Sequence, residues 1–149
     1  MIAQNSSKDL EGLLVVTVEQ AVAAPYTSCR LADAGARVIK VERPEGDFAR
    51  NYDSNALGNS AYFVWLNRGK ESIALDLKNK EDMEVFENII SKSDILIQNL
   101  APGAFERLGL DLKELRLKYP SLITCSISGF GDDGPYKNQK AYDTVSYTH

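Results

Sequence analysis

Five short, mostly apolar segments alternate with segments of helical character, and this alternation constrains the fold more than any other feature of the chain. The first, residues 13–18, contains only leucine, valine and threonine, which is typical of a strand covered on both faces. The other strands are predicted at residues 37–41, 72–77, 94–97 and 122–128. Strands that alternate with helices favour an α/β fold, in which one open parallel sheet of the Rossmann-like kind carries helices on both faces.

The intervening helices are marked by residues that favour helix ends. Pro25 lies at the start and Gly35 just past the end of a helix predicted over residues 25–34, as the preferences of proline and glycine lead us to expect. Apolar residues at helical spacing predict another helix over residues 81–90. The remaining helical segments are a short turn that begins at Pro102 and ends at Gly109, and a helix from Asp111 to Lys118 that Pro120 terminates.

One long connection separates the second and third predicted strands. Residues 42–68 contain Pro44, Gly46, Gly58, several asparagine and aspartate residues and the single tryptophan, so we predict that this stretch is irregular. Loops of this length in compact domains usually have a function.

Length and composition limit the classes of protein to which the chain can belong. Its 149 residues fit one domain, and 44% hydrophobic and 26% charged residues are ordinary for a globular protein. The formal charge of −4 argues against a nucleic-acid or anionic-membrane surface but leaves room for a local basic pocket that binds a small polyanion. No apolar run approaches the ~18 residues of a membrane helix, and the first residues lack the apolar core of a secretory signal. We therefore expect a cytoplasmic protein with no nucleic-acid or membrane partner.

The sequence has few of the residues that several common kinds of catalytic and metal site require. The two cysteines, Cys29 and Cys125, form no C-x-x-C motif, and the only histidine is His149, so we expect neither a metal site nor Ser-His or Cys-His catalysis. No G-x-G-x-x-G motif follows the first strand, where residues 19–25 read Glu-Gln-Ala-Val-Ala-Ala-Pro. A dinucleotide-binding dehydrogenase is therefore disfavoured.

Four loops at the carboxyl ends of the predicted strands carry the residues best suited to bind an anion. Small alanines at positions 21, 23 and 24 would let a ligand approach the backbone at the start of a helix. Taken singly, each loop also has an ordinary interpretation as tight helix packing, a solvated turn or a charged loop. Taken together, they place four polar side chains at one edge of the sheet: Arg43, Lys78, Asn99 and Arg107.

Short motifs along nearly the whole chain resemble those of the class III coenzyme A transferases, which include formyl-CoA and carnitine-related transferases. They are, in chain order, residues 10–12, 23–25, 31–44, 67–70, 75–78, 99–103, 126–131, 134–136 and 141–143. The resemblance implies that coenzyme A or an acyl-CoA is a substrate, that no cofactor is permanently bound, and that the other substrate is a small carboxylic acid.

The resemblance also implies which positions bind the CoA moiety: Val22, Ala23, Arg43, Leu75, Lys78, Asn99, Leu100, Arg107, Lys140 and Tyr142. CoA carries a pyrophosphate and a 3′-phosphate, so the basic members of this set would neutralise a polyanion. The apolar Leu75 and Leu100 would hold the adenine or the pantetheine arm. Val22 departs from the glutamine that some relatives have there, which puts one substrate hydrogen bond in doubt.

Two features favour particular branches of the family. The similar acyl-CoA racemases carry an acid/base histidine where this chain has Tyr142, so racemisation is disfavoured. Residues 18–25 and the segment Gly46-Asp47-Phe48-Ala49-Arg50 look like those of members that act on small dicarboxylates such as itaconate, malate or succinate.

The resemblance places the catalytic nucleophile outside these residues. In the family an aspartate attacks the thioester carbonyl, and the matching position lies beyond His149, whereas Asp143 matches an acidic position that is not the nucleophile. We therefore expect residues 1–149 to be the N-terminal part of the large domain of a longer protein that pairs as an interlocked homodimer. Such a piece would retain a CoA pocket, be inactive alone and expose apolar surface. The alternative is a non-catalytic module that binds CoA or a nucleotide, or that serves in assembly.

Overall fold

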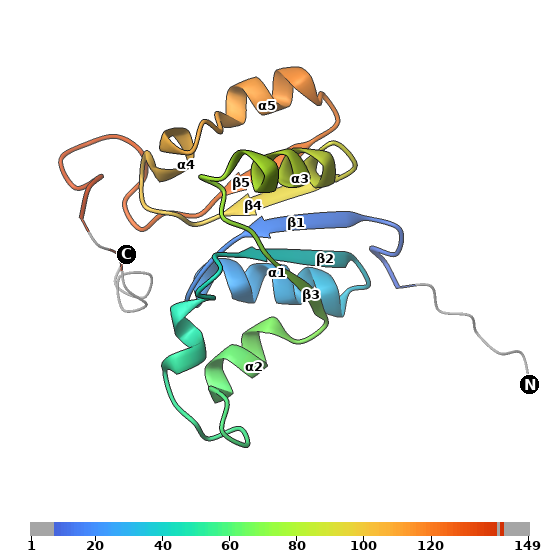
Figure 1. Cartoon of the computed structure of the whole chain (residues 1–149), viewed down its shortest axis with the longest axis vertical. Coiled ribbons are helices and arrows are strands. Elements are labelled where there is room, and N and C mark those ends of the chain that lie inside the picture. The colour runs from blue at the N-terminus through green and yellow to red at the C-terminus, as the bar shows by residue number, and fades with distance from the viewer. Residues whose placement is uncertain (1–7, 140, 142–149) are drawn as a thin grey trace, which may run out of the picture.

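The computed structural model describes residues 8–139 and residue 141, and it has the predicted α/β character (Figure 1). Its elements are, in chain order, β1 (Leu14–Val18), α1 (Ala23–Asp33), β2 (Arg37–Glu42), the 3-10 helix η1 (Phe48–Asn51), α2 (Ala61–Asn67), β3 (Lys70–Ala74), α3 (Lys80–Ile90), β4 (Ile95–Gln98), α4 (Ala104–Arg107), α5 (Leu112–Lys118) and β5 (Ile123–Ser126).

All five strands form one parallel sheet in the order β3-β2-β1-β4-β5. The chain therefore builds outward from β1 to β3 and then returns to the other side of β1 to add β4 and β5. In open α/β sheets, the point at which the strand order reverses is where ligands bind, outside the carboxyl ends of the strands. Here that point lies between β1 and β4.

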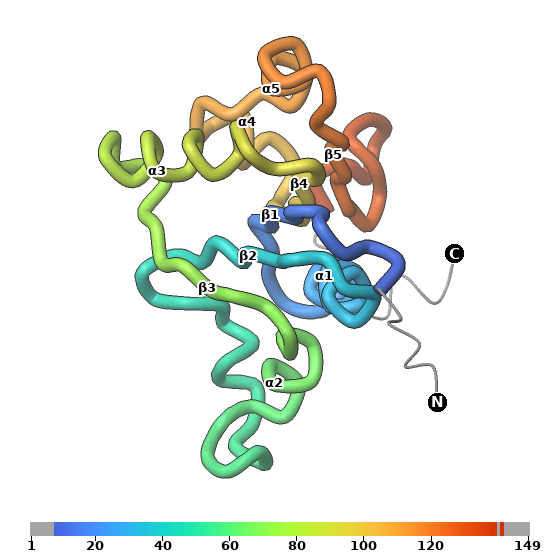
Figure 2. The backbone as a smooth tube through the Cα atoms, turned by 90° about the vertical axis from the view of Figure 1, so that its right-hand side faces the viewer, coloured from blue at the N-terminus to red at the C-terminus, as the bar shows by residue number. Residues whose placement is uncertain are grey.

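Helices cover both faces of the sheet, as the sequence predicts. Helices α3, α4 and α5 lie on one face and α1 and α2 on the other (Figure 1). The first face has an apolar core in which Phe86 and Phe105 pack with Val16 and Leu96. The second has a smaller apolar cluster that includes Val38. In the view of Figure 2, α2 lies at the β3 end of the sheet and α5 at the β5 end.

The connection between β2 and β3 is more regular than the sequence predicts, because it contains η1 and α2. The Asp47 side chain accepts a hydrogen bond from the Ala49 N–H at the start of η1, and Ser60 Oγ accepts one from the Phe63 N–H at the start of α2. These are ordinary N-caps, and they stabilise two short helices. The helices are hard to predict from the sequence because many residues that favour loops lie around them. The prediction of an irregular stretch over residues 42–68 is therefore wrong for η1 and α2.

The other boundaries are close to those predicted, with one shift that matters for the site. Strand β3 begins at Lys70, whereas the prediction was residues 72–77. Lys70 therefore belongs to the sheet and not to the loop before it. Within the described residues, no helix is long and apolar enough to cross a membrane, and no cluster of residues suited to hold a metal ion is found.

Candidate functional site

The predicted CoA-binding residues follow the carboxyl ends of four neighbouring strands. Arg43 comes directly after β2, Leu75 and Lys78 follow β3, and Asn99 follows β4. Val22 and Ala23 lie at the start of α1, after β1; Leu100 follows Asn99; and Arg107 ends α4. Because the strands are parallel, these loops share one edge of the sheet. Lys140 and Tyr142 lie outside the described residues.

Three basic side chains of this set are exposed and unengaged. Within the described part of the chain, no hydrogen bond or ion pair joins a protein group to the side chains of Arg43, Lys78 or Arg107. Arg37, at the amino end of the same strand that Arg43 follows, instead pairs with Glu71 at 2.7 Å. Arginine side chains without a protein partner remain available to a phosphate.

The start of α1 is also available to an anion. Val22 is the N-cap residue and makes no side-chain capping hydrogen bond, and the first turn carries no acidic residue. Helices α2, α3 and α5 differ, because Ser60, Asn79 and Asp111 cap them. The first N–H groups of α1 therefore lack a side-chain acceptor and lie beside small alanine side chains.

The apolar members of the set differ in exposure. Leu75 is buried in the core beneath α3, and its N–H donates to the Glu42 carbonyl at 2.9 Å. Leu100 is half-buried and packs against the same core. Of the two, only Leu100 has a side chain partly open at the edge.

Asn99 holds the loop that joins β1 to α1. Its Oδ1 accepts a hydrogen bond from the Gln20 N–H at 2.9 Å, and its Nδ2 donates to the Gln20 carbonyl at 2.8 Å. The next residue, Ala21, has φ of 64°, a left-handed conformation that is uncommon for a residue with a Cβ. The Asn99 side chain thus fixes backbone next to Val22, whatever it also does toward a ligand.

A buried network of four charged side chains, which the sequence does not predict, lies beneath these loops. Lys40 Nζ lies 2.7 Å from Asp47 Oδ2 and 4.0 Å from Glu19 Oε1, and Lys70 Nζ lies 2.7 Å from Glu19 Oε1. All four side chains are at most 1% exposed. Asn67 Oδ1 accepts from both lysines, at 2.9 and 3.1 Å. Two positive and two negative charges therefore compensate each other out of contact with water.

Burial affects Lys70 in this network. Burial lowers the pKa of Lys70, and the neighbouring Glu19 carboxylate opposes that change. One signal in the sequence pointed to the network: Lys40 interrupts an apolar run that reads as a strand covered on both faces, where a lysine is expected only with a partner.

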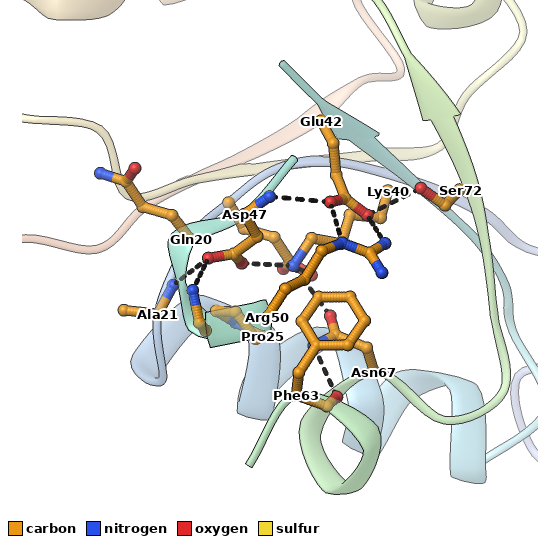
Figure 3. Close-up of polar contacts among 12 residues, drawn as sticks. Gln20, Ala21, Pro25, Lys40, Glu42, Asp47, Arg50, Phe63, Asn67 and Ser72 are labelled. Carbon is orange, nitrogen blue, oxygen red and sulfur yellow. Dashed lines mark hydrogen bonds and ion pairs between the residues drawn. The ribbon is translucent and has the colours of Figure 1, made fainter. Parts of the chain in front are cut away.

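A third buried carboxylate, Glu42, ends β2 immediately before Arg43. Glu42 accepts from Arg50 Nε at 2.9 Å and Nη2 at 2.7 Å, from Ser72 Oγ at 2.8 Å and from the Asp47 N–H at 2.9 Å (Figure 3). Burial alone would raise the pKa of Glu42, but these hydrogen bonds outweigh it and lower the pKa to about 2. The Arg50 guanidinium in turn lies 3.9 Å from the centre of the Phe63 ring.

A cavity of about 780 Å³ lies beside the β5 end of the sheet. Arg107 lines it, together with Arg116, Lys113 and residues of β5, but Arg43 and Lys78 do not. Of the predicted residues, those that the structure describes therefore lie in loops at one edge of the sheet, but no single cavity encloses them.

Comparison with known proteins bears on the family and the fold of the chain. A family described as CoA-transferase family III matches residues 10–148. The acetyl-CoA:oxalate CoA-transferase of Acetobacter aceti is 43% identical over 136 residues, which are 91% of this chain and 35% of that protein. The human succinyl-CoA:glutarate CoA-transferase is 34% identical over 95% of this chain and 33% of its own length.

A solved structure has the same arrangement. The crystal structure of a CAIB/BAIF family protein from Brucella suis superposes with a TM-score of 0.85 at 39% identity, over 93% of this chain and 38% of that one. The chain thus spans about a third of the length of the curated relatives it matches. The family match over nearly all of the sequence means that this chain belongs to CoA-transferase family III.

Proposed function

We propose that the protein transfers coenzyme A between an acyl-CoA and a small carboxylic acid, and that the loops at the carboxyl edge of the sheet bind the CoA moiety. The observation that carries this proposal is a set of basic side chains without a protein partner in loops at the carboxyl edge of the sheet, Arg43, Lys78 and Arg107, in a chain of this family. A guanidinium presents a fork of donors that matches phosphate oxygens, and CoA carries three phosphate groups.

Local positive charge at this edge would allow an acidic protein to bind a polyanionic ligand. The formal charge of −4 would repel CoA at long range. The exposed Arg43 and Lys78, together with the uncapped first turn of α1, oppose that repulsion where the ligand would lie. We propose that Leu100 contacts an apolar part of the ligand, and that Lys140 and Tyr142 complete the site.

The carboxylic acid is proposed to be a small dicarboxylic acid. The names of the relatives include oxalate and glutarate as acceptors of CoA, and the segments over residues 18–25 and 46–50 predict the same class. We propose that residues 1–149 bind CoA without transferring it, because the family resemblance assigns the nucleophilic aspartate to a position beyond His149. The whole protein is proposed to act in the cytoplasm as a homodimer.

Calorimetric titration of the 149-residue chain with CoA tests the binding proposal. Because a charge-assisted hydrogen bond contributes about 1.5 to 3 kcal/mol, Arg43→Ala should weaken CoA binding by about tenfold or more. Arg37→Ala is the matched control, because Arg37 is an exposed arginine at the opposite end of β2, the strand that Arg43 follows, and it is already paired with Glu71. The proposal fails if CoA does not bind saturably, or if both variants bind it as the parent does.

A second function, a binding or assembly module without chemistry, is separated by turnover. In the longer protein, incubation with succinyl-CoA or acetyl-CoA and a panel of dicarboxylates should give CoA exchange, whereas the 149-residue chain should give none. Tight CoA binding with no exchange in the longer protein would favour the module.

A further inference from the structure

We infer that Asp47 is a positioning residue that fixes the loop carrying Arg43 against the loop that leads into α1. The inference rests on the proposed CoA site and adds a residue that does not itself touch the ligand. In the sequence, the segment from Gly46 to Arg50 was interpreted as a marker of substrate class. In the structure its two charged side chains bind protein groups, Lys40 for Asp47 and Glu42 for Arg50 (Figure 3).

Asp47 binds groups from three parts of the chain at once. Its Oδ1 accepts from the Ala21 N–H at 3.3 Å and from the Ala49 N–H at 2.9 Å. Its Oδ2 pairs with Lys40 Nζ at 2.7 Å, and its own N–H donates to Glu42 Oε2 at 2.9 Å. The residue is 4% exposed, so these contacts compete little with water.

The groups that Asp47 joins flank the proposed phosphate site on two sides. Ala21 precedes Val22, the N-cap of α1, and Arg43 lies four residues before Asp47 on the other loop. Ala21 also has the left-handed backbone conformation that external contacts must hold in place. Asn99 holds Gln20 from one side, and Asp47 holds Ala21 from the other. The Asp47 carboxylate therefore links the loop that carries Arg43 directly to the residue before the first turn of α1.

The two oxygens of Asp47 have separable tasks. Oδ1 binds the backbone of both loops, whereas Oδ2 compensates Lys40. In the double variant Lys40→Met/Asp47→Asn, the ion pair is gone but an amide oxygen can still occupy the Oδ1 position. Glu19 keeps Lys70 as its partner, so this variant leaves no unpaired buried charge in the network. Lys40→Met/Asp47→Ala differs from it by lacking the acceptor for the Ala21 and Ala49 N–H groups.

Asp53 supplies a control in the same connection. Its carboxylate accepts from the Ala61 and Asn55 N–H groups, both at 2.9 Å, and from Ser60 Oγ at 3.1 Å. Like Asp47 it holds backbone near a helix start, but none of these partners belongs to the loop before α1. Asp53→Ala should therefore disturb α2 without moving Ala21 or Arg43.

The experiment measures CoA affinity by calorimetry and amide hydrogen exchange at Ala21 by NMR in the 149-residue chain. Lys40→Met/Asp47→Asn should bind CoA within about threefold of the parent, and Lys40→Met/Asp47→Ala on the order of tenfold more weakly, as expected if Arg43 loses its contact with a phosphate. Exchange at Ala21 should be accelerated only in the variant that lacks the acceptor. Asp53→Ala should match the parent in both measurements.

The outcomes separate this inference from the proposed function. If the parent binds CoA but the two double variants bind it equally, the inference is wrong and the CoA site stands. If the parent does not bind CoA, the proposed function fails, and exchange at Ala21 still decides whether Asp47 holds that loop. Unchanged exchange at Ala21 in folded Lys40→Met/Asp47→Ala overturns the inference in either case.

Discussion

The two faces of the sheet are built from different kinds of side chain. Beneath α3, α4 and α5 the strands contribute apolar residues such as Val16 and Leu96 to a continuous core. Beneath α1 and α2 a smaller apolar cluster lies beside buried charged residues, among them Lys40 and Glu42 of β2 and Glu19 just after β1. Apolar burial stabilises a fold but does not depend on the orientation of the groups. Hydrogen-bonded buried charges add little net stability, but they require particular atoms to be in contact. The face beneath α3, α4 and α5 therefore contributes most of the apolar stabilisation, and the buried charges of the other face hold the loops after β1 and β2 in place.

The largest effect is expected on the apolar face. Phe86 is fully buried against Val16 and Leu96. Phe86→Ala removes most of a buried ring and leaves a cavity, so the free energy of unfolding should fall by about 3 to 5 kcal/mol in urea titration. A loss below about 1 kcal/mol would mean that the face can collapse around the gap, and the contrast between the faces would be lost.

A smaller, pH-dependent effect is expected on the polar face. The pKa of Glu42 falls from its ordinary 4.5 to about 2 in the folded chain. Because the folded pKa is the lower one, the stabilisation is complete above about pH 4.5 and is lost as the pH falls toward 2. Arg50 is 44% exposed and partly screened by water, so we expect about 2 kcal/mol in all.

The measurement is urea unfolding of the parent and Glu42→Gln between pH 2 and 7. The difference in stability between them should shrink as the pH falls through this window, because glutamine mimics the protonated acid. A constant difference over the whole range would exclude Glu42 as the source.

The smallest effect is expected at the amino edge of the sheet. Arg37 and Glu71 form a well-aligned pair at 2.7 and 2.9 Å, but both side chains are open to solvent. Surface pairs of this kind contribute little. Arg37→Ala should leave the midpoint of urea unfolding nearly unchanged, and a clear decrease would show that β3 depends on this pair for its register.

The sheet could be predicted because each buried strand is marked by a continuous run of apolar residues in its own segment of the sequence. Continuous apolar runs such as residues 13–18 mark buried parallel strands wherever they occur. Strand β3 was misplaced because it is an edge strand paired only with β2, and its first residues are Lys70, Glu71 and Ser72. The helix α2 was missed because tyrosine, phenylalanine and tryptophan are weak helix formers. The Ser60 cap was the available signal for this helix.

The candidate site divides in the same way. The sequence places Arg43 and Lys78 at one edge because the carboxyl ends of parallel strands all lie at the same edge of the sheet. The roles of Asp47 and Asn99 toward Ala21 and Gln20 could not be predicted, since they join residues that lie 26 and 79 positions apart. Such contacts follow from the register of neighbouring strands, which a single sequence does not specify.

The single tryptophan gives this chain an intrinsic optical probe of the polar face. Trp65 lies on α2, its ring is half-exposed, and its neighbours are Tyr26 on α1 at 6.1 Å and Tyr62 at 6.0 Å between ring centroids. Light absorbed by Tyr26 can therefore be emitted by Trp65 while α1 and α2 stay together. Because the sequence contains no other tryptophan, this emission reports only on the surroundings of α2. It therefore distinguishes detachment of α2 from unfolding of the core around Phe86.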